Sequence, residues 1–267
     1  MAKGGGSPSA KAKAEDESVS MQLRFVCLEY PYKQLEAATN GFHESRRLGE
    51  GSAGTVFQAE LPDGSYAAVK VIDLSALGDN AMVAGFEDEI MILSKFRHPN
   101  LVVLMGWARE GSRRYLLYEF LSGGDVTGRL LKSKTGRQPF LWHERLAVAR
   151  DAATGLAHLH NANPRAFHRD IKSSNILIGQ AGAKMADFGL SCVARSQGKE
   201  MSCKFASGTP GYACPIYTQT GRVTEGSEVH SFGMVLLEMF LNLVPAGMVK
   251  NEIRYPIAET VRLEAPG

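Results

Sequence analysis

The sequence predicts an α+β fold in which a small antiparallel sheet precedes a mainly helical part. Three observations lead to this prediction. Short β-type runs recur between residues 46 and 118, the turn Pro62-Asp63-Gly64 separates the first two of them, and the hydrophobic period becomes helical after Gly124. With 267 residues the chain is long enough for one bilobed domain or two small ones.

The sheet-forming part is expected to hold several strands and one helix. Residues 55–59 and 66–72 are the first two strands, because β-branched and aromatic residues recur in them. A helix follows, since apolar residues lie at helical spacing over residues 86–93. Residues 101–105 and 115–118 are expected to be two further strands.

Two long helices are expected in the second part. The first spans residues 141–160 and the second spans residues 229–243, which is apolar nearly all round, as in a central helix. The buried face of the first is expected to comprise Leu146, Ala149, Ala153, Leu156, Ala157 and His160.

The composition is that of an ordinary soluble globular protein, with 44% apolar and 22% charged residues. A net charge of +2 gives no reason to expect nucleic acid or an anionic membrane as a partner. The four cysteines lack the spacing of zinc or redox sites and are too sparse for a disulfide framework, so reduced thiols are expected.

The chain shows no signal peptide and no transmembrane segment, which predicts a cytoplasmic protein. The best apolar stretch, residues 232–244, is too short to span a bilayer and is interrupted by Glu238. Residues 1–20 are rich in Gly, Ser, Ala and Lys and are expected to form a disordered tail, followed by an N-terminal extension over residues 21–41.

Five short motifs occur in an order that chance does not explain. Glycines in residues 49–56 allow a backbone to approach nucleotide phosphates. Lys70 lies in an otherwise apolar strand, and Glu89 on the next helix is its natural partner. Alone, the glycines would indicate a hairpin turn and the pair a surface salt bridge. Their order favours a lysine held on the α- and β-phosphates of ATP.

The last two motifs are residues 168–175 and 187–189, which carry groups suited to phosphoryl transfer. Asp170 is the expected catalytic base, with positioning more important than basicity because an ordinary carboxyl pKa is about 4. Lys172 can neutralise charge on the transferring phosphoryl group. Asn175 and Asp187 supply hard oxygen ligands for Mg²⁺.

Two other residues of these motifs are expected to be structural. His168 is interpreted as a packed core histidine rather than a reactive one. Phe188 is interpreted as an apolar plug whose position sets the activity state.

The ordered motifs resemble those of a eukaryotic protein kinase. Residues 32–42 are similar to the segment before the kinase domain in plant receptor-like and receptor-like cytoplasmic kinases, and residues 141–146 and 155–160 look like their long helix. Tyr118 resembles the tyrosine gatekeeper of the interleukin-1-receptor-associated kinase and Pelle group.

The resemblance implies a bilobed kinase fold with an N-lobe over residues 42–118 and a hinge and C-lobe over residues 119–267. It implies a serine/threonine kinase, with dual specificity left open, that uses ATP and Mg²⁺ in receptor-like-kinase-type signalling. The partners would be a protein substrate with Ser or Thr hydroxyls and an upstream receptor or activating kinase. The residues implied to bind the nucleotide are Leu48, Gly49, Gly51, Gly54, Val56, Ala68, Lys70, Glu119, Leu121, Asp125 and Leu177.

Kinases of this type are regulated through an activation segment, which here would span residues 187–216. The resemblance makes Arg169 the receptor for a phosphate on that segment. Ser202 and Ser207 are the candidate acceptors of the phosphate, and Thr209 is expected to shape the substrate site.

The chain departs from the family pattern in three places. Ile216 stands where the family has a structural glutamate, and Glu228 replaces the aspartate that anchors the catalytic-loop backbone. The C-lobe is also expected to be shortened, which predicts apolar exposure on the second long helix, at Val235, Leu236 and Met239. These departures leave open an alternative, a nucleotide-binding pseudokinase or scaffold.

Overall fold

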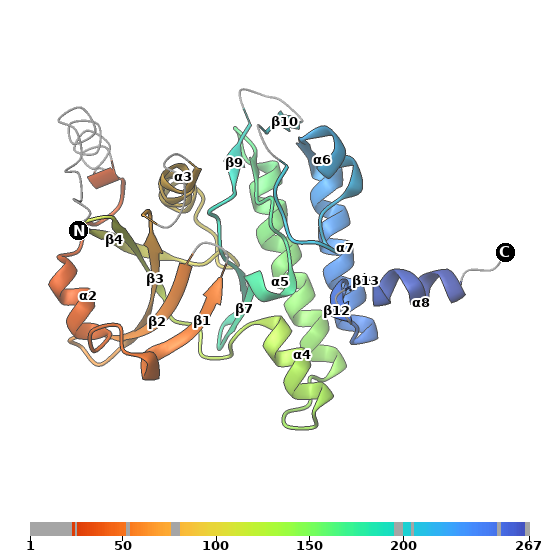
Figure 1. The fold of residues 1–267 in the computed structure, drawn as a ribbon, viewed down its shortest axis with the longest axis horizontal. Coiled ribbons are helices and arrows are strands. Elements are labelled where there is room, and N and C mark those ends of the chain that lie inside the picture. The colour runs from red at the N-terminus through yellow and green to blue at the C-terminus, as the bar shows by residue number, and fades with distance from the viewer. Residues whose placement is uncertain are drawn as a thin grey trace, which may run out of the picture. The chain divides into compact units, whose positions relative to one another are not determined.

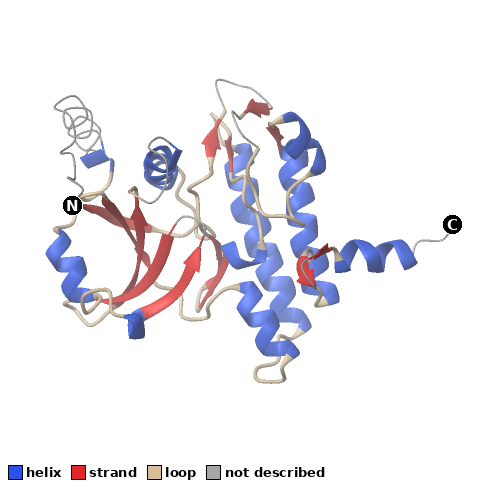
Figure 2. Cartoon of the chain, viewed as in Figure 1, coloured by secondary structure: helices blue, strands red, loops and turns tan. Residues whose placement is uncertain are grey.

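The computed structural model describes residues 23–24, 26–51, 54–75, 81–194, 200–203, 206–249 and 252–264. The tail expected at residues 1–20 lies outside this range. The described residues divide into two compact units. Unit 1 comprises the chain up to Ser94 together with Leu104–Glu119, and unit 2 comprises Lys95–Val103 together with the chain from Phe120. Unit 1 contains the large sheet and unit 2 most of the helices (Figure 2).

Unit 1 is built on a five-stranded antiparallel sheet with the strand order β1-β2-β3-β5-β4 (Figure 1). The strands are β1 (Arg47–Gly51), β2 (Gly54–Glu60), β3 (Tyr66–Asp73), β4 (Leu104–Glu110) and β5 (Arg113–Glu119). The helix α3 (Ala81–Lys95) connects β3 to the segment before β4, and the short helix η1 (Glu44–Arg46) precedes β1. These elements confirm the antiparallel sheet with one interposed helix that the sequence predicts.

The N-terminal extension packs as part of unit 1. Its helix α2 (Tyr32–Ala38) places Leu35, which is 2% exposed, in the same core cluster as Val69 and Leu117. Just before α2, the backbone N–H of Tyr30 donates to the carbonyl of Trp107 in β4 at 2.7 Å. The ring of Tyr30 covers Gly106 so closely that a Cβ there would lie 2.3 Å from it, which explains the glycine.

The strand predicted at residues 101–105 is correct only for its last two residues, because the strand β4 begins at Leu104 and runs to Glu110. The residues before it belong to unit 2, where they pair with the strand β8 (Gly182–Met185). Val102 donates its N–H to the carbonyl of Met185 at 2.9 Å, and Leu101 forms a parallel bridge to the same residue. Leu101, Val102 and Leu104 are therefore buried by two different elements, which hydrophobicity alone does not reveal.

Unit 2 is dominated by helices, with small two-stranded sheets between them (Figures 1 and 2). The described helices are α4 (Val126–Lys134), α5 (Trp142–Asn161), η2 (Ser173–Asn175), α6 (Pro215–Thr220), α7 (Glu225–Leu241) and α8 (Pro256–Glu264). The strand pairs are β6 (Ala166–Phe167) with β9 (Cys192–Val193), β7 (Ile176–Gly179) with β8, β10 (Glu200–Ser202) with β11 (Arg222–Thr224), and β12 (Gly247–Val249) with β13 (Glu252–Arg254). Among the described residues, no helix combines the length and apolar character that crossing a bilayer requires.

The predicted buried face of α5 is mostly wrong, although the helix itself is present. Leu146, expected to be buried, is 44% exposed, and the buried positions are Val148, Ala152, Gly155, Leu156, Leu159 and His160. Alanines recur along the helix, so several phases have an apolar face of similar quality. Gly155 lies on the face that is buried, because a Cβ there would lie 2.6 Å from the carbonyl oxygen of Asn100.

The predicted apolar exposure on α7 is also wrong for its central residues. Val235 and Met239 are fully buried, and Leu236 is half-buried. α7 packs against α5, and the Arg145 guanidinium of α5 donates to the carbonyl of Met239. The exposed large apolar side chains of α7 lie instead toward its two ends, at Val229, Phe240 and Leu241.

Candidate active site

The predicted site residues are divided between the two units. In unit 1, Lys70 lies in β3, paired with Val56 of β2 on one side and with Leu116 of β5 on the other. Its Nζ lies 2.9 Å from Oε2 of Glu89 in α3, and both side chains are buried, 8% and 1% exposed. The ion pair expected from the sequence is therefore present, and the removal of either charge would leave the other buried without it.

The glycine-rich segment forms the hairpin between β1 and β2, with residues 52–53 outside the described range. At Gly54, where φ is +145°, a Cβ would lie 2.0 Å from the carbonyl oxygen of Val71. A side chain at this position is excluded by the backbone of the neighbouring strand. A Cβ added at Gly49 would meet nothing within 4 Å, so the surrounding protein does not require glycine there.

The pairing of the strands shows where the other residues of unit 1 that are predicted to contact the nucleotide lie. Val56, Ala68 and Lys70 share one face of the sheet, because opposed residues and residues two apart point the same way. Leu48 on β1 is 48% exposed. Glu119 is the last residue of β5 and pairs with Ala67.

In unit 2, Asp170 is buried, 5% exposed, and is held by several neighbours. Thr209 Oγ1 donates to Asp170 Oδ1 at 2.7 Å, and Lys172 Nζ lies 2.7 Å from Asp170 Oδ2. Lys172 Nζ also donates to Thr209 Oγ1 at 3.0 Å. The carboxylate, the ammonium group and the hydroxyl thus form a closed triangle.

The side chain of Asn175 supports the same loop from η2. Its Nδ2 donates to the carbonyl of Asp170 at 2.9 Å and lies 3.2 Å from Asp170 Oδ2. Because the amide nitrogen makes these bonds, the amide oxygen Oδ1 is the atom left for a cation. The carbonyl of Asn175 accepts from the N–H of Ala186 at 2.9 Å, which places Asp187 next in the chain beside this loop.

Asp187 adopts a left-handed backbone, with φ at +64°. The next residue, Phe188, is fully buried, and its ring packs on that of His168 with 4.7 Å between ring centroids. His168 is itself fully buried, and its Nε2 lies 3.0 Å from the carbonyl of Ala186. The two residues expected to be structural are indeed in the core of unit 2.

Asn175 and Asp187 supply the kinds of oxygen donor that a magnesium ion takes. No group of three or more His, Cys, Asp or Glu suited to a metal occurs within the described part of the chain. Magnesium does not need such a cage, because it usually takes one or two carboxylates and completes its shell with phosphates and water. The carboxylate of Asp187 and the amide oxygen of Asn175 match that requirement.

Glu228 anchors the catalytic-loop backbone, although it stands where the family has an aspartate. It lies in the first turn of α7 and is 2% exposed. Its Oε1 accepts from the backbone N–H of Arg169 at 2.6 Å, and its Oε2 lies 2.7 Å from His160 Nε2. The longer side chain thus still anchors the catalytic-loop backbone, which weakens one argument for an inactive protein.

The remaining predicted residues of unit 2 have structural roles that the sequence does not reveal. Asp125 caps α4, accepting from the N–H of Gly128 at 2.9 Å, and forms a backbone bridge to Leu177 in β7. Leu121 is buried, 9% exposed. If the Asp125 carboxylate binds the nucleotide as expected from the sequence, it does so while also capping α4.

The segment after Asp187 brings Arg169 to Tyr217 of α6. The guanidinium donates to the Tyr217 hydroxyl at 2.9 Å and to the carbonyl of Leu190 at 2.9 Å. The same hydroxyl accepts from the N–H of Ser207 at 3.1 Å, whereas Ser202 is exposed on β10. Of the two candidate acceptors, Ser207 is the one tied to the group that contacts Arg169.

Sequence reasoning missed a buried polar network behind the catalytic loop. Tyr212 donates its hydroxyl to Glu238 Oε2 at 2.6 Å, and Ser173 Oγ lies 3.0 Å from that hydroxyl. Thr127 Oγ1 lies 2.5 Å from Ser173 Oγ. Burial raises the pKa of the Glu238 carboxyl. A signal was available, because a carboxylate within the apolar run 232–244 requires a buried partner.

Comparison with known proteins agrees with this geometry. Residues 42–263 match the family model described as protein kinase domain. The chain is 36% identical over 260 residues to the serine/threonine-protein kinase CDG1 of Arabidopsis thaliana, covering 93% of this chain and 59% of that protein. From the same organism, the receptor-like kinase TMK4 is 39% identical over 227 residues, covering 84% of this chain and 24% of that protein.

A third relative, the probable serine/threonine-protein kinase PBL26 of Arabidopsis thaliana, is 36% identical over 230 residues, covering 85% of this chain and 55% of that protein. The chain thus spans less than two thirds of the length of each of these relatives. The family model, in contrast, matches most of the chain, and the chain belongs to the protein kinase domain family.

Proposed function

We propose that the chain is a serine/threonine protein kinase, which transfers the γ-phosphoryl group of ATP to Ser or Thr hydroxyls of a protein substrate. The observation that carries the proposal is the triangle of Asp170, Lys172 and Thr209. In it, a buried carboxylate already accepts a hydrogen bond from a hydroxyl, beside an ammonium group. A substrate hydroxyl needs the same acceptor and the same neighbouring cation.

The residues of the triangle have distinct roles in the proposed reaction. Asp170 orients the substrate hydroxyl and accepts its proton as the oxygen bonds to the γ-phosphorus and ADP leaves. Lys172 stabilises negative charge on the transferring group. Asn175 and Asp187 would hold Mg²⁺, which supplies charge neutralisation at the phosphates when bound. Thr209 holds the side chains of Asp170 and Lys172 in place through its hydroxyl and shapes the substrate site.

The residues proposed to bind the nucleotide are taken from each unit separately. Lys70, held by Glu89, would bind the α- and β-phosphates, and the backbone of the glycine-rich hairpin would approach them. The other proposed contacts are Leu48, Gly49, Gly51, Gly54, Val56, Ala68, Glu119, Leu121, Asp125 and Leu177. Their burial and register support the assignment to differing degrees, and Asp125 has the least support because it caps α4.

The wider setting is also a proposal. Relatives named as receptor-like kinases support receptor-like-kinase-type signalling. A cytoplasmic location and an upstream receptor or activating kinase are proposed with it. The kinase lobes are proposed to follow the sequence-based limits, 42–118 and 119–267. In the structure, Lys95–Val103 belongs with the second of these rather than the first.

Autophosphorylation with labelled ATP and Mg²⁺ tests the proposal. We expect phosphate incorporation by the wild type and its loss, by about a hundredfold or more, in Asp170→Asn, which keeps the shape but removes the proton acceptor. Asp63→Asn, in an exposed turn of unit 1, is the control and should retain activity. Thermal stabilisation by ATP in wild type without phosphate incorporation would refute the enzyme and favour the scaffold.

A further inference from the structure

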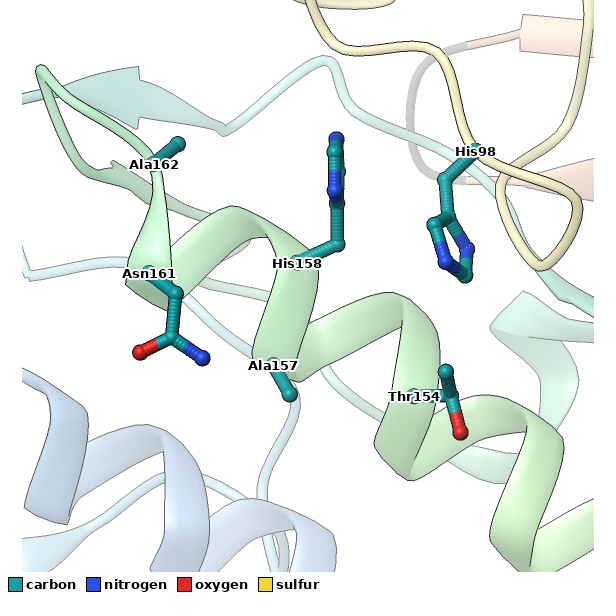
Figure 3. Close-up of a pocket in the computed structure, with 6 residues that line it drawn as sticks. All are labelled: His98, Thr154, Ala157, His158, Asn161 and Ala162. Carbon is teal, nitrogen blue, oxygen red and sulfur yellow. The ribbon is translucent and has the colours of Figure 1, made fainter.

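Two histidines pack together in an open pocket of unit 2 (Figure 3). His98 comes from the segment Lys95–Val103 and His158 from α5, and their rings stack with 4.8 Å between centroids and 29° between planes. Thr154, Ala157, Asn161 and Ala162 complete the lining of the pocket, which has a volume of about 400 Å³. The rings are thus close to one another and accessible to water.

The hydrogen bonding of His98 sets the tautomer of its neutral ring. The backbone N–H of Asn100 donates to His98 Nδ1 at 3.1 Å, so this nitrogen uses its lone pair as an acceptor. A proton added to Nδ1 would face the Asn100 N–H, donor against donor, and would place a charge beside the His158 ring. Burial, and next the His158 ring, hold the pKa of His98 below its usual range.

Asn100 ties the same segment to the strand that leads to Asp187. Its carbonyl accepts from the N–H of Met185 at 2.9 Å, and its Nδ2 donates to the carbonyl of Ala183 at 2.9 Å. Met185 is the last residue of β8 and lies two positions before Asp187. A change at His98 therefore acts on Asn100 directly and on β8 through it.

The other charged groups on these elements do not favour protonation of His98. Lys95 and Arg97 lie on its own segment, and Lys184 lies on β8. On α5, the carboxylate of Asp151 accepts from the N–H of Ala183 at 3.0 Å and pairs with Arg150. The nearby carboxylate is thus already used to hold β8.

A metal ion is the other ligand that two histidines can bind, but the hydrogen bonding opposes it. With Nδ1 accepting from Asn100, the neutral His98 ring carries its proton on Nε2, so neither nitrogen has a lone pair for a metal. No third ligand completes such a cluster within the residues that the structure describes. A proton is therefore the ligand to which this pair responds.

We propose that His98 and His158 form a pH-sensitive contact: protonation of His98 breaks its bond to Asn100 and loosens the segment Lys95–Val103 from β8, and with it the position of Asp187. The folded state binds fewer protons here than the unfolded chain. The contact is therefore fully formed above the ordinary histidine pKa of about 6.5 and is lost as the pH falls through the lowered value. Its consequence for phosphoryl transfer rests on the proposed function, whereas the loosening does not.

Hydrogen exchange at the backbone amides of Asn100, Val102 and Met185 tests the loosening without any nucleotide. Between about pH 7.5 and about pH 5, on either side of the ordinary histidine pKa, we expect a several-fold rise in exchange after correction for intrinsic chemistry. His98→Asn should abolish the rise, because an asparagine carbonyl accepts an N–H two residues on and does not titrate. An equal rise in His98→Asn would overturn the proposal.

A second variant keeps the test decisive if His98→Asn does not fold. His158→Phe preserves a stacked ring but removes the imidazole that lowers the pKa of His98, so the rise in exchange should begin at a higher pH than in wild type. His143→Gln, exposed at the start of the same helix, is the control and should match wild type. An unchanged midpoint in His158→Phe would refute the role of the pair.

Two further outcomes separate this proposal from its alternatives. Stabilisation by Zn²⁺ at neutral pH that is lost in both His98→Asn and His158→Phe would assign the pair to metal binding and overturn the pH-sensitive contact. If exchange responds as expected but autophosphorylation is absent at every pH, the proposed function fails and this contact stands.

Discussion

The two units position their charged groups by different means. In unit 1, Lys70 is placed by the regular register of β3 between β2 and β5, and its position follows from backbone pairing. In unit 2, Asp170 and Asp187 lie outside regular strands and helices, next to or at backbone positions with positive φ, +68° at Arg169 and +64° at Asp187.

The loops of unit 2 are held by buried polar side chains, whereas the strands of unit 1 are held by a ladder of backbone hydrogen bonds. Glu228 binds the backbone of Arg169, His168 accepts from the N–H of Asp170, and Asn175 binds the carbonyl of Asp170. A ladder shares its free energy among many bonds, whereas each of these side chains satisfies specific buried groups. We therefore expect single side-chain changes remote from the reacting atoms to cost more in unit 2 than in unit 1.

The largest expected effect is at Glu228. Glu228→Ala removes the acceptor for Arg169 N–H and the partner of His160, so the free energy of unfolding should fall by about 3 kcal/mol, with autophosphorylation lost. Glu225→Ala, in the same turn but more exposed and paired with Arg165, should cost less than about 1 kcal/mol. Urea denaturation measures both, and equal costs would contradict a special role for the buried anchor.

The matching test in unit 1 is at Gly54, where the backbone of a neighbouring strand, not a side chain, sets the requirement. Gly54→Ala places a Cβ 2.0 Å from the Val71 carbonyl oxygen, so β2 and β3 must separate locally, at a cost of about 2 kcal/mol. Gly49→Ala in the same hairpin meets nothing within 4 Å and should cost less than about 1 kcal/mol. If the two variants unfold at the same urea concentration, the register argument for unit 1 is wrong.

The same difference explains how much could be predicted from sequence. The sheet, α3 and the Lys70–Glu89 pair follow from strand alternation and from a charge in an apolar strand, which are local signals. The motifs of unit 2 identify Asp170, Lys172, Asn175 and Asp187 as residues, but their contacts join parts of the chain far apart. Thr209, for example, reaches Asp170 from 39 residues away.

The errors have the same origin. The phase of α5 depends on what packs against it, and Gly155 fits beneath Asn100, a residue more than fifty positions earlier. The apolar run over residues 101–105 belongs to two elements. Its first residues pair with β8, and its last two are the start of β4 in the large sheet. Glu238 is visible in the sequence as a charge in an apolar helix, yet its partner Tyr212 is supplied only by the fold.

The third prediction concerns the pH dependence of the network at Glu238. Folding raises the pKa of this carboxyl above its ordinary value of about 4.5, mainly through burial. The folded state therefore binds more protons than the unfolded chain, so this group stabilises fully below that value and the stabilisation is lost as the pH rises through the folded pKa. Glu238→Gln keeps an acceptor for the Tyr212 hydroxyl but does not titrate.

Urea denaturation of both proteins at a series of pH values between about 4.5 and 8 measures this effect against the ordinary carboxyl pKa. We expect the stability of wild type relative to Glu238→Gln to decrease as the pH rises. A constant difference across the series would show that the carboxyl is not perturbed and that the network carries no cost of burial. Tyr212→Phe removes the hydroxyl donor, so this variant should be less stable than wild type. Its stability should also depend more steeply on pH than that of wild type.

The smallest expected effect is at Ile216, where the chain departs from the family's structural glutamate. Ile216 lies in α6, and its side chain is 68% exposed, so Ile216→Glu exchanges one solvated side chain for another. We expect a change of less than about 0.5 kcal/mol in the free energy of unfolding and no change in autophosphorylation. Tyr217→Phe, the next residue, is the contrasting variant, because it removes the hydroxyl that accepts from Arg169 and from Ser207. A gain of more than about 1 kcal/mol in Ile216→Glu would mean that a partner for the glutamate exists after all, and that unit 2 depends on charge pairs at its surface as well as on those in its core.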